Sequence, residues 1–442
     1  MHNVRLISSS PEACWLERPA PAGGGAVHLT VLESQFQRIE GFGGCFNELG
    51  WIALSQLDEA MRKQALDALF DPVSGCRFSL CRLPIGASDY AEDWYSLAEV
   101  DEDYALRSFS IDRDRRHLLP YLREALVRQP DMRLFASPWS PPVWMKSPRV
   151  YNFGVLRWEK KVLESYARYF VKYIRAYEAL GIRIEQIHPQ NEPASNQKFP
   201  SCRWTGEQLR EFIAEYLGPL FETEGINTQI WLGTINAPEA DDYLHTDYDA
   251  FAGTVLGDER ARRYIAGVGY QWGGKHAIQR THEAWPDLPL LQTENECGDG
   301  KNTWEYAAYV FSLMKHYFSN GASGYVYWNM ALLPRGRSTW GWEQNTMITA
   351  DPVQNRIVFN PEYYLMKHFS HCIDNGAIRL GTSGPLSANA LAFRNPNGST
   401  AVVLCNSLDT ERQATVAGCD GVWDIPMPPC SFHTLMIPAG KQ

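Results

Sequence analysis

The sequence contains no uninterrupted apolar run of 18 or more residues, so it predicts no membrane-spanning helix. It also has no cluster of basic residues to set against its formal net charge of −10. A charge of this sign repels phosphate backbones and anionic lipids, and we expect no nucleic acid partner and no stable membrane insertion. Low-complexity segments are absent too, and 45% hydrophobic residues are enough to bury a sizeable core. The composition therefore predicts a folded globular protein.

The ten cysteines include no Cys-x-x-Cys pair, and the first twenty residues lack the charged and apolar segments of a secretory signal. We therefore expect a cytoplasmic protein. Cys76 and Cys81 flank a predicted buried strand and are interpreted as free core thiols rather than as a zinc site or redox pair. Ligand spacings rich in His or Asp are also absent, so we predict no metal and no cofactor. The oligomeric state is left open.

Aromatic residues are abundant, with 15 Trp and 21 Tyr. Sugar rings present apolar C–H faces that stack on aromatic rings, so carbohydrate sites are commonly lined with Trp and Tyr. Any single Trp is more often an ordinary core residue. The composition thus favours a carbohydrate or glycoside substrate without establishing one.

Residues 38–374 alternate short apolar runs with longer amphipathic segments, the pattern of repeated strand–helix units around a parallel sheet. The helical segments include residues 162–180, followed by Gly181 as a stop, and a helix that begins after Thr205 with Gln208 as its capping-box partner. The apolar runs give eight candidate strands, at 38–46, 78–86, 132–140, 182–192, 228–236, 264–272, 289–296 and 323–330. Eight such units predict a (β/α)8 barrel, with catalytic residues at the C-terminal ends of its strands.

The two ends of the chain have a different pattern. Residues 375–442 form short alternating stretches separated by turn sequences, and residues 1–37 contain a strand-like run at 26–32. We expect both segments to join in one small antiparallel β-domain beside the barrel. The predicted boundaries are therefore 1–37, 38–374 and 375–442.

Two carboxylic acids stand at predicted strand ends. Glu192 follows an apolar run in IEQIHPQNEP, and Pro193 disfavours the helical region for the residue before it, so the strand should end there. Glu294 follows the buried Leu290 and Leu291 in PLLQTENECGDG. Hydrolysis of a glycoside with retention of configuration needs two such groups about 5–5.5 Å apart, one acid and one nucleophile.

Glu296 is the alternative to Glu294, because residues two apart on a strand point the same way. Depth along the strand favours Glu294, since CGDG at 297–300 is typical of a loop. Glu296 is interpreted as a loop carboxyl, paired with a basic residue such as Lys301 or Arg335.

Aromatic and polar side chains accompany the other predicted strand ends. A ring of Trp and Tyr around two carboxyls is typical of a pyranose pocket, and Asp89 and Asn345 are suited to bind sugar hydroxyls. The aromatic residues at these ends are Trp139, Trp144, Tyr270, Trp272 and Trp328.

The chain resembles the glucosylceramidase family of glycoside hydrolases, family 30, whose barrels carry catalytic Glu residues on the fourth and seventh strands. The matching motifs span nearly the whole barrel in the family's order. They are GFGGCFNE at 41–48, RLPIGASDY at 82–90, FASPWSPPVWMK at 135–146, QNEP at 190–193, QTENECG at 292–298, YWNMAL at 327–332 and YYLMKHFS at 363–370.

This resemblance implies a (β/α)8 barrel with a β-sandwich built from both termini, and retention of configuration. It makes Glu192 the acid/base and Glu294 the nucleophile. The residues that it places around the non-reducing sugar are Asp89, Trp139, Asn191, Trp328 and Asn345. Tyr270 or Gln271 would lie near the nucleophile, but GVGYQW departs from the His-Trp-Tyr common there. The hydrogen-bonding partner of the nucleophile therefore stays open.

Three functions are compatible with these features. An exo-acting β-glycosidase on small glycosides or oligosaccharides, such as a β-glucosidase, β-xylosidase or glucosylceramidase, agrees best with a cytoplasmic location. An endo-acting β-1,6-glucanase or xylanase is the alternative within the family. A catalytically silent carbohydrate-binding protein is disfavoured, because binding alone gains nothing from two mutually repelling acids. The sequence does not identify the sugar, since epimers differ in a single hydroxyl.

Overall fold

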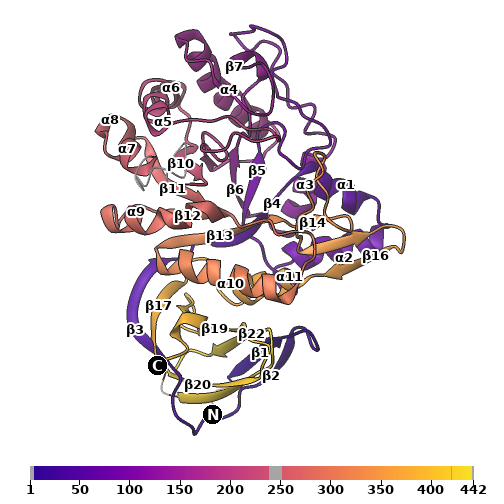
Figure 1. Cartoon of the computed structure of the whole chain (residues 1–442), viewed down its shortest axis with the longest axis vertical. Helices are drawn as coiled ribbons and strands as arrows, with labels where there is room; N and C mark the ends of the chain where they lie inside the picture. Colours follow the sequence, from indigo (N-terminus) through magenta and orange to yellow (C-terminus); the bar gives the residue numbers. More distant parts are fainter. Residues whose placement is uncertain (1–3, 238–250, 420, 441–442) are drawn as a thin grey trace.

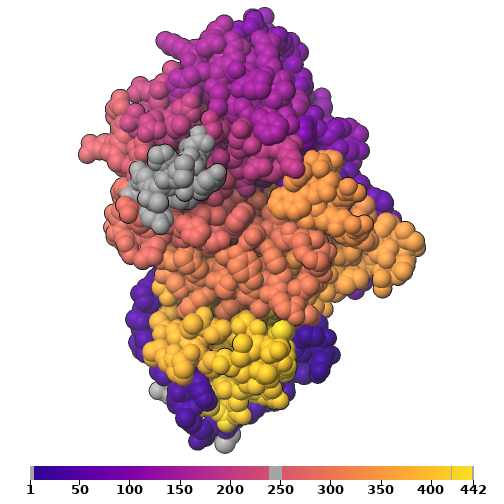
Figure 2. All heavy atoms as spheres, in the orientation of Figure 1, coloured from indigo at the N-terminus to yellow at the C-terminus, as the bar shows by residue number. Residues whose placement is uncertain are grey.

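The computed structural model describes residues 4–237, 251–419 and 421–440. It consists of a barrel surrounded by helices and a β-domain that lies beside this layer of helices (Figure 1). Figure 2 shows the β-domain as a lobe in which the N-terminal and C-terminal segments lie side by side.

Eight parallel strands close the barrel in the order β10-β11-β12-β13-β4-β5-β6-β9, which confirms the predicted (β/α)8 fold. The strands are β4 (Gly41–Cys45), β5 (Leu80–Pro84), β6 (Arg133–Ser137), β9 (Gln186–Ile187), β10 (Gln229–Ile235), β11 (Ile265–Gln271), β12 (Leu290–Glu294) and β13 (Ala322–Asn329). Seven of them are shorter than their predicted ranges, whereas β13 is as long as the predicted range 323–330 and begins one residue earlier.

The difference is greatest at the fourth strand, where the predicted range 182–192 contains only the two residues of β9. Beyond β9 the backbone no longer forms a regular ladder, but it stays bonded to both neighbouring strands. The N–H of His188 donates to Ala136 O at 2.9 Å, and the N–H of Gln190 donates to Gly233 O at 3.2 Å. The segment that leads to Glu192 is thus held in the barrel wall without being a strand.

The helices of the barrel surround its strands (Figure 1). Their bounds are α1 (Glu48–Ser55), α2 (Glu59–Phe70), α3 (Leu118–Arg128), α4 (Lys160–Glu178), α5 (Gly206–Glu211), α6 (Gly218–Glu224), α7 (Ala252–Leu256), α8 (Glu259–Arg262), α9 (Ile278–Ala284), α10 (Trp304–Ser319) and α11 (Pro361–Ser370). A π-helical turn η2 (Phe212–Leu217) lies between α5 and α6, and η1 (Val143–Met145) and η3 (Trp272–His276) are short 3-10 turns; a further 3-10 turn, η4 (Ser387–Asn389), belongs to the β-domain. The predicted capping box of α5 is present, with Thr205 and Gln208 bonded to each other's backbone N–H. Gly181 ends the α4 region in a left-handed conformation, as predicted (φ 76°).

Two apolar layers lie on the two faces of the barrel sheet. Leu291 points into the barrel beside Phe135 and Trp231, whereas its neighbour Leu290 packs outward against the helices. Burying a side chain of this size contributes roughly 1.5–3 kcal/mol. The alternation of the strands therefore stabilises both layers and directs the last inward residues toward the mouth of the barrel.

The β-domain is a nine-stranded sheet in the order β2-β1-β22-β19-β18-β17-β3-β20-β21. Its strands are β1 (Arg5–Ser9), β2 (Leu16–Pro19), β3 (Leu29–Arg38), β17 (Ile378–Ser383), β18 (Ala390–Arg394), β19 (Thr400–Asn406), β20 (Arg412–Gly418), β21 (Gly421–Met427) and β22 (Ser431–Ile437). Both chain ends contribute, as predicted. The sheet is not wholly antiparallel, because β3 pairs with β20 in parallel.

Two smaller sheets lie in loops for which we predicted no strands. β7 (Lys146–Ser147) pairs with β8 (Val155–Leu156), and β14 (Ala331–Leu332), β15 (Ile348–Asp351) and β16 (Arg356–Phe359) form a three-stranded sheet. These segments are too short, or too mixed in polarity, to give a strand pattern in the sequence.

All ten cysteines are free thiols. Burial raises the pKa of both Cys76 and Cys81 to about 12, in agreement with their interpretation as core residues. Among the residues that the structure describes, no helix is both long and apolar enough to cross a bilayer. Within the same residues, no group of three or more His, Cys, Asp or Glu is placed to hold a metal ion.

Candidate active site

Glu192 lies at the end of the fourth barrel segment, five residues beyond β9. Its backbone is left-handed (φ 49°), which costs a non-glycine residue on the order of 1–3 kcal/mol, and Pro193 behind it disfavours the right-handed helical region. The Ser195 hydroxyl donates to Oε2 of Glu192 at 2.7 Å, and Asn236 donates to the Ser195 hydroxyl at 2.9 Å. A strained backbone and a two-step hydrogen-bond chain therefore fix this carboxyl at the mouth of the barrel.

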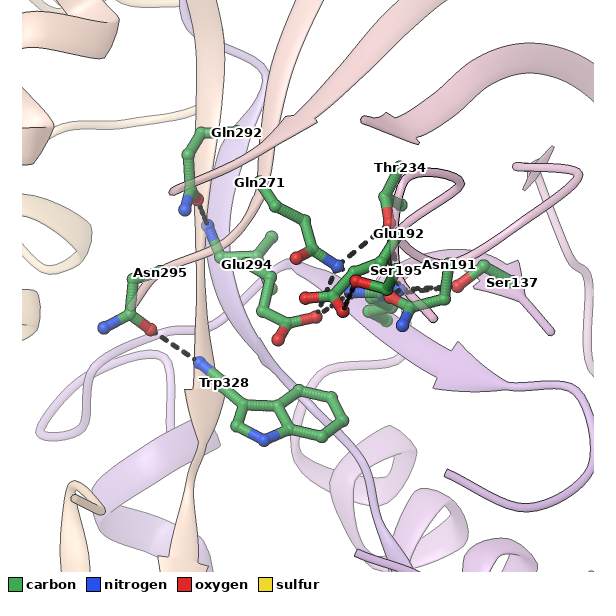
Figure 3. A network of polar contacts seen from close by, with 12 residues as sticks. Ser137, Asn191, Glu192, Ser195, Thr234, Gln271, Gln292, Glu294, Asn295 and Trp328 are labelled. Atoms are coloured by element: carbon green, nitrogen blue, oxygen red, sulfur yellow. Dashed lines mark hydrogen bonds and ion pairs between the residues drawn. The ribbon is translucent and has the colours of Figure 1, made fainter. Parts of the chain in front are cut away.

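Glu294 is the last residue of β12 and points toward the same space as Glu192 (Figure 3). Its Oε2 accepts a hydrogen bond from Arg82 Nη1 at 2.5 Å and another from Gln271 Nε2 at 2.9 Å. No side chain among the described residues donates to Oε1 of Glu294. One oxygen is thus held by the protein, and the other is left for a ligand.

Arg82 is the central cation of the site. It lies on β5 with a fully buried side chain, and its guanidinium lies 4.5 Å from the ring centroid of Trp139. Besides Glu294, it donates twice to Ser137 Oγ, at 2.7 and 3.1 Å, and to Asn191 Oδ1 at 2.6 Å. A single side chain therefore links the ends of four barrel segments.

The carboxyl groups of the site are buried together, and burial is the largest influence on each of them. It raises the pKa of Glu192, against the opposing effects of Ser195 and Arg82. It also raises the pKa of Glu294 well above its ordinary value; Arg82 opposes this, while Glu192 and Asp89 add to it. Burial, reinforced by the charge of Glu192, raises the pKa of Asp89 to about 7. Since only Glu294 contacts the cation directly, it is the group best placed to carry a negative charge.

A cavity of about 630 Å³ opens above these groups. This volume is within the range of about 300–1,000 Å³ that holds a drug-sized ligand, so the cavity has room for more than one sugar ring. Its walls combine carboxyls with aromatic rings from several loops. The lining residues are Asp89, Trp139, Glu192, Ser195, Gln197, Lys198, Phe199, Asn236, Trp272, Glu294, Cys297, Trp340, Gly341, Trp342 and Gln344.

Of the predicted binding residues, Asp89 and Trp139 line the cavity directly, and only 5% and 2% of their surfaces are exposed. Asn191 and Gln271 lie beside the two carboxyls, where Gln271 Nε2 donates to Asn191 Oδ1 at 2.6 Å (Figure 3). Trp328 packs on Trp139, with ring centroids 5.3 Å apart. Predicted binding residues from five segments of the barrel thus come together in the structure.

Tyr270 does not lie in the cavity. Its ring is buried on the outer face of β11, and its hydroxyl bonds with Thr281 on α9. Successive strand residues point to opposite faces, so Gln271 points inward and Tyr270 outward. The sequence left both Tyr270 and Gln271 as possible neighbours of Glu294, and in the structure Gln271 is the one whose side chain bonds to it.

Asn345 is not a cavity residue either, contrary to prediction. Its Oδ1 accepts hydrogen bonds from the backbone N–H of Gly300 at 2.9 Å and of Asn302 at 3.3 Å, and its Nδ2 donates to Glu362 at 2.6 Å. These contacts hold the loop after β12 in place. Gln344, the residue before it, lines the cavity instead.

Glu296 lies in the loop after β12 and does not line the cavity between Glu192 and Glu294. The predicted pairing with Lys301 or Arg335 is wrong, because both basic groups bind other carboxylates. Glu296 instead accepts a hydrogen bond from the Tyr309 hydroxyl on α10 at 2.5 Å. β12 ends at Glu294, and the chain has turned outward by residue 296.

Several residues of the site were not predicted from the sequence. Arg82 belongs to one of the matching motifs but was not predicted as a site residue, although a charged residue inside an apolar strand is itself a sign of a buried partner. Ser195, Phe199, Trp340 and Trp342 lie on loops whose conformation no periodic pattern predicts. Aromatic residues in such loops are too common for the sequence alone to select these.

Comparisons with known proteins agree with this geometry. The family model "Glycosyl hydrolase family 30 TIM-barrel domain" matches residues 39–373, and "Glycosyl hydrolase family 30 beta sandwich domain" matches residues 376–435. The chain belongs to glycosyl hydrolase family 30. It is therefore a glycoside hydrolase, and its substrates are carbohydrates.

Relatives of this family 30 protein are named for different activities. It is 29% identical to "Putative glucosylceramidase 1" of Caenorhabditis elegans, over 86% of this chain and 76% of that protein. It is 26% identical to "Endo-1,6-beta-D-glucanase" of Neurospora crassa, over 95% of this chain and 90% of that protein. The crystal structure of SrfJ from Salmonella typhimurium matches with a TM-score of 0.89 and 26% identity, over 99% of this chain and all of that one.

Proposed function

We propose that this family 30 enzyme is a retaining β-glycosidase that acts on the non-reducing end of small β-glycosides or oligosaccharides. The observation that carries the proposal is the different environment of its two carboxyls. Oε2 of Glu294 is bonded to the cation Arg82, whereas Glu192 accepts its side-chain hydrogen bond from a neutral hydroxyl. One group is suited to stay ionised and the other to hold a proton.

These environments suit a double displacement. The ionised Glu294 attacks the anomeric carbon through Oε1, an ester forms, and the leaving oxygen takes the proton of Glu192. The ester carries no charge, so the electrostatic penalty for ionising Glu192 falls. Glu192 then deprotonates a water molecule, whose oxygen attacks the anomeric carbon; the bond to Glu294 breaks, and the sugar and the Glu294 carboxylate are released. Arg82 and Gln271 hold the other oxygen of Glu294 during both steps.

The depth of the cavity supports exo action. Its inner wall contains Asp89 and Trp139, and behind Trp139 lies the buried Trp328. The Tyr90 hydroxyl next to Asp89 donates to Gly336 O at 2.7 Å, so the inner wall is bonded to the loop after β14. A terminal sugar fits against such a wall, whereas a chain that continued past it would need an opening there.

Endo action is the second candidate, and it is favoured by the relative from N. crassa, which is named as an endo-1,6-β-glucanase. Digestion of β-1,6-glucan distinguishes the two. An exo enzyme releases monosaccharide from the start of the reaction, whereas an endo enzyme first releases oligosaccharides of several lengths.

A covalent trap tests the two catalytic assignments. A 2-fluoro glycosyl fluoride should inactivate the enzyme and label the peptide of β12 at Glu294. A label on Glu296 would overturn the assignment of the nucleophile. Failure to cleave any member of a panel of nitrophenyl β-glycosides would refute the proposed activity and favour a protein that only binds carbohydrate.

A further inference from the structure

A second cavity of about 640 Å³ adjoins the catalytic one. The two cavities share three lining residues, Trp272, Cys297 and Trp342. The second cavity lies between the loop after β12 and the first turns of α10. The catalytic steps proposed above use none of the residues that line only this cavity, which are Glu296, Gly298, Asp299, Lys301, Thr303, Glu305, Tyr306 and Tyr309.

Aromatic rings line this cavity on opposite sides. Tyr306 and Tyr309 on α10 pack edge to face, with centroids 5.8 Å apart, and Trp272 and Trp342 form the boundary with the catalytic cavity. Tyr309 and Trp342 are 36% and 39% exposed, so their rings are accessible to a ligand. Exposed ring faces in a concave site are suited to stack on the C–H faces of sugar rings.

The charges of the second cavity exclude some ligands. Three carboxylates line it, and the lysine among its residues, Lys301, is paired with Asp299. Glu296 and Glu305 therefore leave a net negative potential, which disfavours uronic acids, phosphates and other anions. Carboxylates are good acceptors for sugar hydroxyls, whereas an alkyl chain would gain nothing from them and would desolvate them. A neutral, hydroxyl-rich ligand fits this lining.

The position of the cavity indicates which part of a substrate it meets. Asp89 and Trp139 lie at the buried end of the catalytic cavity, whereas Trp342 lies at its exposed end. A sugar that is held between Glu192 and Glu294 with its terminal hydroxyls toward Asp89 must direct its leaving group outward. The leaving group then passes Trp272 and Trp342 into the second cavity.

We propose that the second cavity binds the neutral sugar unit on the leaving-group side of the scissile bond, and that the enzyme prefers β-linked oligosaccharides to glycosides with lipid or acidic aglycones. This inference rests on the proposed exo-acting β-glycosidase activity and names its substrate class. Tyr309 contributes a stacking face, and Glu296 accepts hydroxyl hydrogen bonds.

The test compares a substrate too short to fill the second cavity with one that reaches it. The enzyme and its Tyr309→Ala variant are assayed with nitrophenyl β-D-glucoside and with β-1,3-, β-1,4- and β-1,6-linked glucotrioses. Loss of one stacking ring should lower kcat/KM for the cleaved triose about 3- to 10-fold while changing the value for the aryl glucoside less than about 2-fold. Tyr309→Phe, which keeps the ring, should retain most activity on the triose.

Two controls separate binding from folding. Tyr216→Ala, at a partly exposed tyrosine on η2 that lines neither cavity, should change neither substrate's kcat/KM. If Tyr309→Ala proves unstable, Glu296→Gln removes a charge without changing shape, and it should also lower kcat/KM for the triose alone.

The outcomes are distinguishable. A wild-type enzyme that cleaves neither the aryl glucoside nor other nitrophenyl β-glycosides would refute the proposed function. The second sugar site alone would be refuted by a wild-type enzyme that cleaves the aryl glucoside but no triose. It would also be refuted if the variants lowered both activities equally or left both unchanged. Faster cleavage of a glucoside with a long alkyl or an acidic aglycone than of any triose would also overturn it.

Discussion

Replacing Arg82 with Met should change the protonation of Glu294 more than any other single substitution at the site. The guanidinium Nη1 lies 2.5 Å from Glu294 Oε2, and both groups are buried. With an effective dielectric constant of about 20, unit charges about 4 Å apart interact by about 4 kcal/mol. Removing the cation should therefore raise the pKa of Glu294 still further above its ordinary value.

The assay is the pH dependence of kcat/KM for a dinitrophenyl β-glycoside, whose leaving group needs no proton. Its acidic limb reports the ionisation of the nucleophile in the free enzyme, and we expect this limb to move to higher pH in Arg82→Met. A folded state that binds a proton more tightly than the unfolded chain loses stability as the pH rises. The variant should thus lose more unfolding free energy at alkaline than at acidic pH, approaching about 3–5 kcal/mol.

Ser137→Ala is the matched control for Arg82→Met. It removes two hydrogen bonds from the guanidinium but keeps the charge, so the acidic limb should move by less than about half a unit. If Arg82→Met folds and its acidic limb coincides with that of the wild type, Arg82 does not control the ionisation of Glu294.

Three further predictions follow from single side chains. Glu192→Gln should abolish turnover of alkyl glycosides while largely sparing glycosylation by dinitrophenyl glycosides; equal loss in pre-steady-state assays would contradict its role as the acid. Burial lowers the pKa of His433 to about 3, so this residue should reduce the free energy of unfolding by roughly 2 kcal/mol as the pH falls from about 6.5 to 4.5. His433→Asn should therefore show a flatter pH dependence in urea unfolding. Asn345→Ala removes the contacts of the loop after β12 and leaves Glu362 short of a donor, which should cost about 1–3 kcal/mol of stability. A hundredfold loss of kcat/KM for Asn345→Ala at unchanged stability would instead show that Asn345 contacts the substrate.

The fold could be predicted because it depends on local patterns. Each barrel strand is an apolar run that must be buried on both faces, and each run ends where polar residues begin. That rule also located Glu192 and Glu294, since each stands a few residues beyond the end of such a run. The structure places both at the mouth of the barrel, where a catalytic role would require them.

The orientation of side chains near the strand ends could not be predicted in the same way. The pairing of β11 with β12 shifts register between Tyr270 and Gln271, so simple alternation did not decide which of them faces Glu294. The contact of Arg82 with Glu294 joins residues 212 positions apart, and its strength depends on burial by the whole barrel. Such long-range electrostatics have no periodic signature in the sequence.

The pairing of β1 with β22 has a consequence for how the protein is made. Arg5 lies opposite Met436, and β22 also pairs with β19, so β22 joins the first strand of the chain to the rest of its sheet. At about 5–20 residues per second, a ribosome needs roughly 20–90 s to travel from one partner to the other. During that time β1 and β2 cannot pair with the rest of their sheet, because β22 has not yet been synthesised. The barrel, whose segments lie between β1 and β22 in the sequence, can already close. The enzyme should therefore emerge as a folded barrel with an unfinished β-domain, and a chain that lost only β22 would leave β1 and β2 permanently detached from the sheet.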